Sequence, residues 1–163
     1  MATELETAKK RAMYLLGGRD YSRKELLDKL LKNYSREICE EAVRQMEEYG
    51  YLDDRRYADK LARKFVEVRK YGKSRAKMMM IQKGLGPSIA DEALSRYSAD
   101  DMVEEITAII EKKYMDRLSA DGNEGMKEMQ KVMAALARRG YGYEDIKKAI
   151  SLVRENTEFE EEW

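Results

Sequence analysis

The sequence contains no histidine, one cysteine and one proline, and these shortages exclude several classes of protein. Without histidine, the chain has no Ser-His-Asp or Cys-His catalytic triad and none of the usual zinc sites. The single thiol, Cys39, has no intramolecular disulfide partner, and its apolar neighbours Ile38, Ala42 and Val43 predict a buried core position. We therefore expect no enzymatic activity, no metal and no cofactor.

Long apolar runs are also missing. No segment approaches membrane-spanning length, and the first seven residues lack the apolar part of a signal peptide, so we expect a cytoplasmic protein without membrane contact. The chain of 163 residues is nevertheless 43% hydrophobic, which is enough for a core. Basic and acidic residues both number 32, and a formal net charge of zero argues against a protein that simply coats DNA.

Apolar residues recur three and four positions apart along almost the whole chain, as is typical of amphipathic helices. This spacing predicts nine helices, and no segment shows sustained strand alternation. Capping boxes, in which a side chain at the helix start and one three residues later bind each other's backbone amides, are predicted for Thr3 with Glu6 and Ser22 with Glu25.

The nine predicted helices fall into three groups with matching residues. Each third helix follows an apolar residue and carries alanine eight positions later, in the pairs Tyr34 and Ala42, Leu85 and Ala93, and Tyr141 and Ala149. We therefore predict an all-α fold of three tandem, helix-turn-helix-like three-helix repeats that form an elongated, curved module. The predicted boundaries are 1–52, 53–97 and 98–155, with a polar loop inserted at 119–125 and an acidic C-terminal tail at 156–163.

Positive charge is concentrated in the second repeat. Residues 53–97 carry 12 basic and 6 acidic side chains, a net of +6, whereas residues 98–163 carry 10 and 16, a net of −6. A basic stripe of this kind neutralises phosphates, or it is a solvated face or the partner of the acidic third repeat, and the sequence leaves these open. The candidate contact residues of the stripe are Arg55, Arg56, Arg63, Lys64, Arg69, Lys70, Lys73, Arg75 and Lys77.

Four segments resemble one known family. Gly50-Tyr51-Leu52-Asp53-Asp54, followed by Tyr57, closely resembles the Gly-Tyr-Leu/Ile-Asp-Asp motif of the RecX family of recombinase regulators. Residues 19–26, 71–85 and 136–146 are similar to segments of the family's first, second and third units, in that order. The resemblance implies a fold of three tandem three-helix units, in agreement with the repeats above.

The resemblance also implies a function. Members of the family regulate homologous recombination and DNA repair in the SOS response: they bind RecA, the strand-exchange ATPase, in the groove of its filament on single-stranded DNA. They inhibit strand exchange and ATP hydrolysis, without catalytic residues or a cofactor. The expected partners are the RecA filament and, as a second candidate, single-stranded DNA, and the chain is expected to be a monomer. In the third repeat, Arg138, Arg139 and Tyr141 join the candidate contact residues.

Two other functions compete with this interpretation. Three-helix units of this size also occur in helix-turn-helix DNA-binding regulators, although the helix expected at 87–96 is a poor reader of the major groove. The neighbouring carboxylates Asp53 and Asp54 suggest a hydrolase, but they fit better as a helix cap and a first-turn acid that the helix dipole favours. Tyr51 and Leu52 are predicted to pack where the first two repeats meet.

Overall fold

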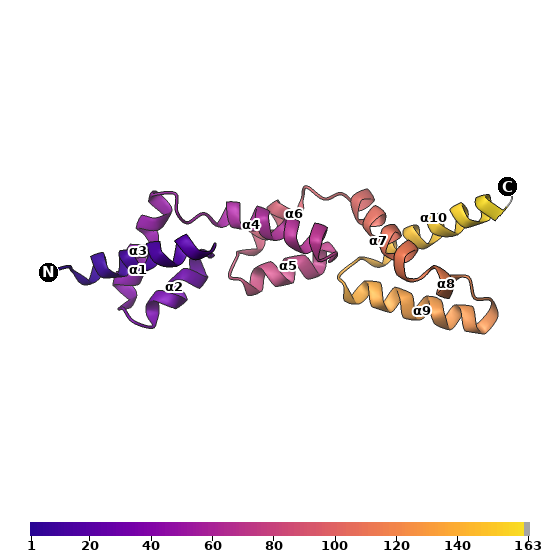
Figure 1. Cartoon of the computed structure of the whole chain (residues 1–163), viewed down its shortest axis with the longest axis horizontal. Helices are drawn as coiled ribbons and strands as arrows, with labels where there is room; N and C mark the ends of the chain where they lie inside the picture. Colours follow the sequence, from indigo (N-terminus) through magenta and orange to yellow (C-terminus); the bar gives the residue numbers. More distant parts are fainter. Residues whose placement is uncertain (162–163) are drawn as a thin grey trace. The chain divides into compact units, whose positions relative to one another are not determined.

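The computed structural model describes the backbone of residues 1–161 and the side chains of residues 1–157 (Figure 1). Every regular element in this part of the chain is a helix, as predicted. The helices are α1 (Glu4–Gly18), α2 (Arg23–Leu31), α3 (Arg36–Glu48), α4 (Asp54–Arg63), the π-helical turn η1 (Lys64–Val68), α5 (Lys73–Gln82), α6 (Pro87–Leu94), α7 (Ala99–Lys113), α8 (Met115–Leu118), α9 (Gly122–Arg138) and α10 (Tyr143–Glu161).

These helices form two compact units. Unit 1 contains Met1–Arg63 and Lys77–Leu94, and unit 2 contains Lys64–Ala76 and the chain from Ser95 onward. The second repeat is thus divided: α4, most of α5 and α6 pack with the first repeat, whereas η1 and the start of α5 pack with the third. Sequence periodicity identifies helices, but it does not show which of them pack together.

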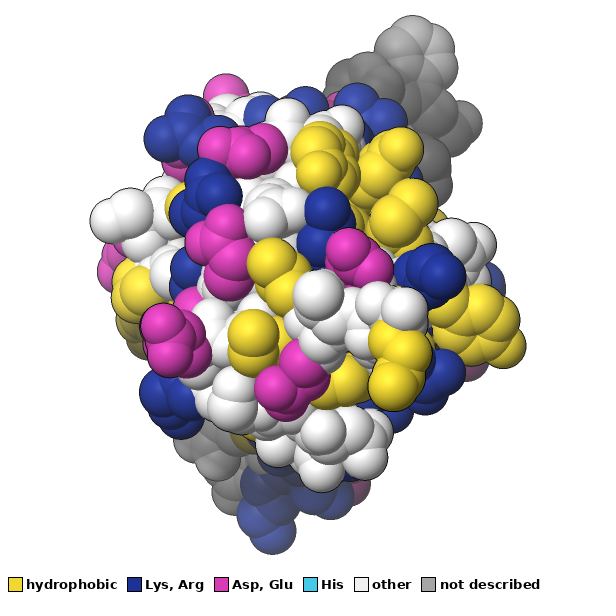
Figure 2. All heavy atoms as spheres, turned by 90° about the vertical axis from the view of Figure 1, so that its left-hand side faces the viewer, with side chains coloured by type: hydrophobic (Ala, Val, Ile, Leu, Met, Phe, Trp, Pro, Cys, Tyr) yellow, Lys and Arg dark blue, Asp and Glu magenta, His cyan; other side chains and the backbone are white. Residues whose placement is uncertain are grey.

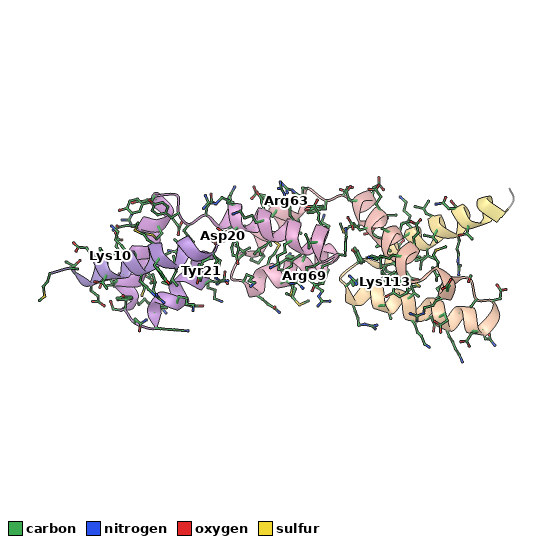
Figure 3. All side chains as sticks on the ribbon, in the orientation of Figure 1. Lys10, Asp20, Tyr21, Arg63, Arg69 and Lys113 are labelled. Atoms are coloured by element: carbon green, nitrogen blue, oxygen red, sulfur yellow. The ribbon has the colours of Figure 1, made fainter. Side chains whose placement is uncertain are left out.

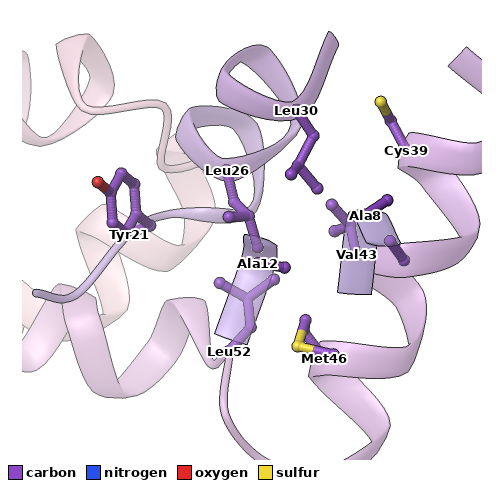
Figure 4. Packing of buried hydrophobic residues seen from close by; sticks show 10 residues of the cluster. Ala8, Ala12, Tyr21, Leu26, Leu30, Cys39, Val43, Met46 and Leu52 are labelled. Carbon is purple, nitrogen blue, oxygen red and sulfur yellow. The ribbon is translucent and has the colours of Figure 1, made fainter. Parts of the chain in front are cut away.

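The core of the first repeat is built from small residues on α1, large ones on α2 and a mixture of both on α3. Ala8 and Ala12 are fully buried and let α1 approach α3 closely, while Leu26, Val43 and Met46 fill the space between the helices (Figure 4). The buried Cys39 confirms the core position predicted for the thiol, and its Sγ lies 3.6 Å from the Tyr34 carbonyl oxygen.

Helix starts follow the predicted capping chemistry. Both predicted capping boxes are present, Thr3 with Glu6 on α1 and Ser22 with Glu25 on α2. A third box, Ser98 with Asp101 on α7, was missed because aspartate stands where the motif usually has glutamate or glutamine.

The link between α3 and α4 corrects one prediction. Gly50 adopts the left-handed conformation, with φ of 77°, and the amide groups of Tyr51 and Leu52 both donate to the Met46 carbonyl oxygen at 3.0 and 3.2 Å. Leu52 is buried in the core of the first repeat. Tyr51 remains 51% exposed and makes an edge contact with Tyr49, so its predicted packing between the repeats is wrong. Neighbouring side chains in this non-helical link point in different directions, and only one of them enters the core.

The predicted polar loop at 119–125 is also shorter than expected. α9 begins at Gly122, and Asp121 stands in the N-cap position with extended dihedral angles. A β-carbon added at the buried Gly125 would lie 2.2 Å from the Ala120 carbonyl oxygen, so glycine is required there by a close approach of the backbone. The polar and glycine-rich composition suggested a loop, whereas Gly125 lies in the first turn of α9 and lets the backbone of the preceding link approach it.

The end of the third repeat continues past the predicted boundary at residue 155. α10 runs to Glu161, so the backbone of the predicted acidic tail is helical up to this residue. The side chains of residues 158–161 and the whole of residues 162–163 lie outside the described part of the chain, and they include all of the tail's acidic groups.

Candidate functional site: a basic surface on two repeats

The twelve candidate contact residues are divided between the two units. Figure 3 labels one residue from each group, Arg63 and Arg69. Unit 1 holds Arg55, Arg56, Arg63 and Lys77, and unit 2 holds Lys64, Arg69, Lys70, Lys73, Arg75, Arg138, Arg139 and Tyr141. Their partners within each unit show which of them already have a structural role.

Three of the four cations in unit 1 have internal partners. Arg55 forms an ion pair with Glu92 at 3.3 Å, and Lys77 pairs with Asp91 at 2.9 Å, so both link their helices to α6. Arg56 donates to the Gly50 carbonyl oxygen at 3.3 Å. The ion pairs are exposed and contribute little stability, so a binding partner can displace them at low cost.

In unit 2, two turns interlock around Lys70. Lys70 has φ of 58° and is the one non-glycine residue with positive φ among those described. Its carbonyl oxygen accepts from Arg139 Nη1 at 3.2 Å and from the Tyr141 hydroxyl at 3.0 Å, and the Gly72 amide donates to the Arg139 carbonyl oxygen at 2.8 Å. The joint between residues 69–72 and 138–141 is therefore held by backbone groups on both sides.

Arg139 and Tyr141 consequently serve this joint rather than an outer surface. The Tyr141 side chain is only 5% exposed, and burial raises the pKa of its hydroxyl to about 12. A buried phenol whose hydroxyl already has an acceptor is not available to a partner in this structure. The sequence placed both residues among the contact residues because it does not show which carbonyl groups lie opposite them.

Three further basic side chains near the joint, those of Lys70, Lys73 and Arg75, interact with neighbouring groups of unit 2. Lys70 forms an ion pair with Glu105 at 2.8 Å, and Lys73 Nζ donates to the Tyr97 carbonyl oxygen at 2.7 Å. The guanidinium of Arg75 lies 4.2 Å from the centre of the Tyr71 ring, a distance typical of cation–π contact. These side chains fix local geometry while leaving positive charge at the surface.

Four exposed cations remain without such a role. Within the described part of the chain, the side chains of these four form no ion pair, hydrogen bond or cation–π contact: Arg63, Lys64, Arg69 and Arg138. Exposed cations without internal partners are the ones that can bind an anionic partner without first losing another interaction. They form the candidate contact set. Arg63 and Lys64 lie at the end of α4 and the start of η1, and Arg69 and Arg138 lie in the joint, where only their backbone groups take part in hydrogen bonds.

A joint of the same kind occurs in unit 1, and sequence analysis missed both. The fully buried Ser22 donates its hydroxyl to the Lys83 carbonyl oxygen at 2.5 Å, and a β-carbon on Gly84 would lie 2.8 Å from Lys24 Cβ. In each joint, the turn before the second helix of one repeat meets the turn before the third helix of the next. One signal for these joints was present in the sequence: Gly84 and Gly140 directly precede Leu85 and Tyr141, which occupy matching positions in the second and third repeats.

The carboxylates of the hydrolase alternative both have structural partners. Asp53 Oδ1 accepts from the amides of Arg55 and Arg56 at 3.0 and 3.2 Å, which confirms the predicted cap of α4. Asp54 Oδ1 accepts from the Arg23 amide at 2.8 Å, and burial raises the pKa of Asp54. The described residues include no group of three or more Cys, Asp or Glu side chains placed to hold a metal ion.

The first repeat shows no comparable concentration of charge. Figure 2 views the part of the molecule at the left of Figure 1, where acidic and basic side chains are interspersed. This agrees with the sequence, because residues 1–52 carry 10 basic and 10 acidic side chains. A contact between basic side chains and an anionic partner is therefore expected from the candidate residues of the second and third repeats and not from the first repeat.

Comparison with known proteins decides the family. Residues 8–46, 53–94 and 99–150 match, in this order, the first, second and third three-helix domains of RecX. The chain belongs to the RecX family. This confirms the resemblance seen in the sequence motifs, and it assigns the three-helix repeats to the three domains of a family of regulatory proteins.

Individual RecX proteins show the extent of the similarity. The chain is 32% identical over 151 residues to the regulatory protein RecX of Vibrio campbellii, covering 92% of this chain and 94% of that protein. It is 28% identical over 144 residues to RecX of Clostridioides difficile, but spans only 66% of that longer relative. The crystal structure of RecX from Lactobacillus salivarius shares the fold, with a TM-score of 0.84 at 23% identity over 92% of this chain and 96% of that one.

No helix in the described part of this RecX-family chain is both long enough and apolar enough to cross a membrane.

Proposed function

We propose that this RecX-family protein binds the RecA filament on single-stranded DNA and inhibits strand exchange and ATP hydrolysis. Membership of a family of regulatory proteins supports a regulatory role. The observation that carries the choice of partner is the set of exposed cations without internal partners. Three of the four lie within residues 55–83, which hold 11 basic and 2 acidic side chains. The filament groove, as the family resemblance implies, presents DNA phosphates and acidic side chains.

The physical basis of this binding is local charge in a chain of zero net charge. Cations that neutralise phosphates release condensed counterions, and this release drives association and makes it sensitive to salt. A neutral chain gains little from nonspecific attraction to DNA, because its acidic regions are repelled. The proposed contact is therefore confined to the basic surface, and single-stranded DNA is proposed to contribute as part of the filament.

The helix-turn-helix alternative has less support. In the second repeat, the helix that would enter the major groove is α6, and its exposed residues include Asp91 and Glu92. In the first repeat, the exposed residues of α3 include Glu37, Glu40 and Glu48. Carboxylates on these surfaces repel DNA phosphates. On α3 they also hold the exposed Arg36 and Arg44 in ion pairs, which occupies the arginine forks that could distinguish bases. A protein–DNA filament with separate anionic sites fits the charge distribution better than naked duplex.

The test uses four substitutions of side chains that make no contact within the joint: R63Q, K64Q, R69Q and R138Q in one chain. We expect this variant to inhibit the single-strand-dependent ATPase of RecA more weakly than wild type, with unchanged helicity. Lys73 and Arg75 are left intact because their substitution would also disturb local structure.

The matched control removes the same number of charges elsewhere. Lys10, Lys29, Lys32 and Lys127 are exposed, and their side chains form no ion pair or hydrogen bond with the described residues. K10Q, K29Q, K32Q and K127Q together should therefore leave inhibition near the wild-type level. Equal inhibition by both variants and wild type would show that the basic surface is only a solvated face. An equal loss in both variants would show an effect of total charge.

A further inference from the structure

A shallow groove with an acidic rim lies on the third repeat, between α7 and α10. Its volume is about 600 Å³. The lining residues from α7 lie three or four positions apart, and those from α10 lie four positions apart. Each set therefore occupies one face of its helix. The lining includes Asp100, Val103, Glu104, Ala108 and Glu111 from α7 and Lys148 and Leu152 from α10.

The floor of the groove is apolar and partly uncovered. Val103 is buried where α7 packs against α10, while Leu152 on α10 is 38% exposed and Ala108 on α7 is exposed. An exposed leucine beside a small residue gives a partner's apolar side chain a place to bury surface. A surface that only contacts water has no need of apolar side chains such as Leu152 and Ala108.

The rim carries more negative than positive charge. Lys148 Nζ lies 3.5 Å from Asp100 Oδ1, which offsets one carboxylate. Glu104 and Glu111 are exposed and have no ion-pair partner in the described part of the chain. Asp100 and Glu104 are also four residues apart on α7, where like charges destabilise a helix. A cationic partner would relieve this repulsion.

We propose that this groove binds an amphipathic helix of a partner protein, with an apolar face flanked by lysine or arginine. An apolar floor beside an acidic rim on α7 is complementary to such a helix, as in other helix-in-groove complexes. The same acidic rim repels nucleic acid and anionic lipid. The groove has the opposite charge from the basic surface described above, so this site is independent of the proposed contact with the filament.

The experiment measures binding of a fluorescent synthetic helix to the full-length protein by anisotropy. The peptide has about 18 residues, with leucines at i, i+3, i+4 and i+7 and lysines beside them. We expect E104K/E111K to weaken binding at least about tenfold and L152A to weaken it to a smaller extent. Circular dichroism and thermal unfolding verify that each variant is folded.

Two controls distinguish binding in the groove from nonspecific attraction of a cationic peptide to acidic residues. Asp28 and Glu155 are exposed, lie inside helices and have no ion-pair partner in the described residues, so D28K/E155K makes the same change of charge without touching the groove. This variant should bind the peptide as wild type does, and a peptide with serine in place of leucine should bind poorly. Failure of the wild type to bind, equal loss in both charge variants, or equal binding of the serine peptide would each overturn the proposal. Self-association that E104K/E111K abolishes would overturn it as well, by assigning the groove to a second copy of the chain.

Discussion

At the scale of single residues, the hydrogen-bond partner of a side chain decides its role more than its type. Asp53 and Asp54 are adjacent carboxylates, yet the first caps α4 and the second binds the start of α2. Arg138 and Arg139 are adjacent cations, yet the first is exposed without an internal side-chain partner and the second donates to the Lys70 carbonyl oxygen. The sequence shows two like residues in each pair and does not reveal that their roles differ.

The cap of α4 gives the first prediction. Asp53→Ala should lower the free energy of unfolding by about 1 kcal/mol, because two amides at the helix start lose their acceptor. Denaturant unfolding of the variant and wild type measures the difference. Asp59→Ala, an exposed position inside the same helix, is the control and should change stability little. Equal stability of D53A and wild type would contradict the role of Asp53 as a cap.

The buried phenols predict a loss of stability at high pH. Burial raises the pKa of both Tyr57 and Tyr141 from 10.0 to about 12. The folded state therefore keeps both hydroxyls protonated while the unfolded chain ionises them. Their contribution is complete below about pH 10 and is lost as the pH rises to about 12. Unfolding measured across this range should show a steady decrease in wild-type stability.

Tyr141→Phe tests this at one site. At neutral pH the variant should lose about 1 kcal/mol with the hydrogen bond to the Lys70 carbonyl oxygen. Its stability should then decline less steeply than that of wild type between about pH 10 and about pH 12, because one shifted group has been removed. Tyr14→Phe changes a side chain that is 74% exposed and should leave the pH profile unchanged. If the stability of Y141F and wild type declined equally steeply over this pH range, the raised pKa of Tyr141 would be contradicted.

At the scale of elements, the repeats are joined by turns rather than by helix faces alone. A β-carbon at Gly72 would lie 2.2 Å from the Gly140 carbonyl carbon, and one at Gly140, where φ is 94°, would lie 2.5 Å from Arg75 Cβ. Backbone atoms leave no room for either methyl group. The close approach of these two turns makes the Lys70 carbonyl oxygen accessible to Arg139 and Tyr141.

Gly72→Ala should consequently destabilise unit 2 by at least about 2 kcal/mol, because the new methyl group meets backbone rather than a flexible side chain. Gly17→Ala, in α1 with open space around it, should instead leave stability unchanged or raise it by up to about 1 kcal/mol. Urea unfolding of both variants gives the comparison. Similar effects of the two substitutions would show that the turns are not tightly packed.

At the scale of the whole molecule, opposite charges are separated along a chain that is neutral overall. The second repeat has a net of +6 and the segment from residue 98 a net of −6. Each region carries its own candidate surface, one basic and one acidic. Net charge alone would have excluded an anionic partner, whereas the local distribution supports one.

Salt dependence tests the basic surface. The affinity for RecA filaments should fall as salt rises, and R63Q/K64Q/R69Q/R138Q should flatten the plot of log affinity against log salt. Each lost phosphate contact lowers the slope by about 0.7 to 0.9. Co-sedimentation across a salt series measures the slope, with K10Q/K29Q/K32Q/K127Q as the control. Unchanged slopes in the first variant would contradict direct contact by these four cations.

The sequence by itself determined the features that depend on neighbours within a few positions. Helix periodicity, the caps at Thr3, Ser22 and Asp53, the turn at Gly50 and the burial of Cys39 all follow from local spacing and composition. The repeats and the family motifs could be recognised for the same reason. Such features need no knowledge of which distant residue lies opposite.

Only the tertiary structure decided the features that depend on distant backbone groups. It placed Tyr51 outside and Tyr141 inside, converted most of the predicted loop at 119–125 into the start of α9, and paired the turns at Gly72 and Gly140. It also separated the cations with internal partners from the four without them. Hydrogen bonding and burial are set by contacts between segments about 70 residues apart, as between Lys70 and Tyr141, and one-dimensional patterns carry no distance information of that kind.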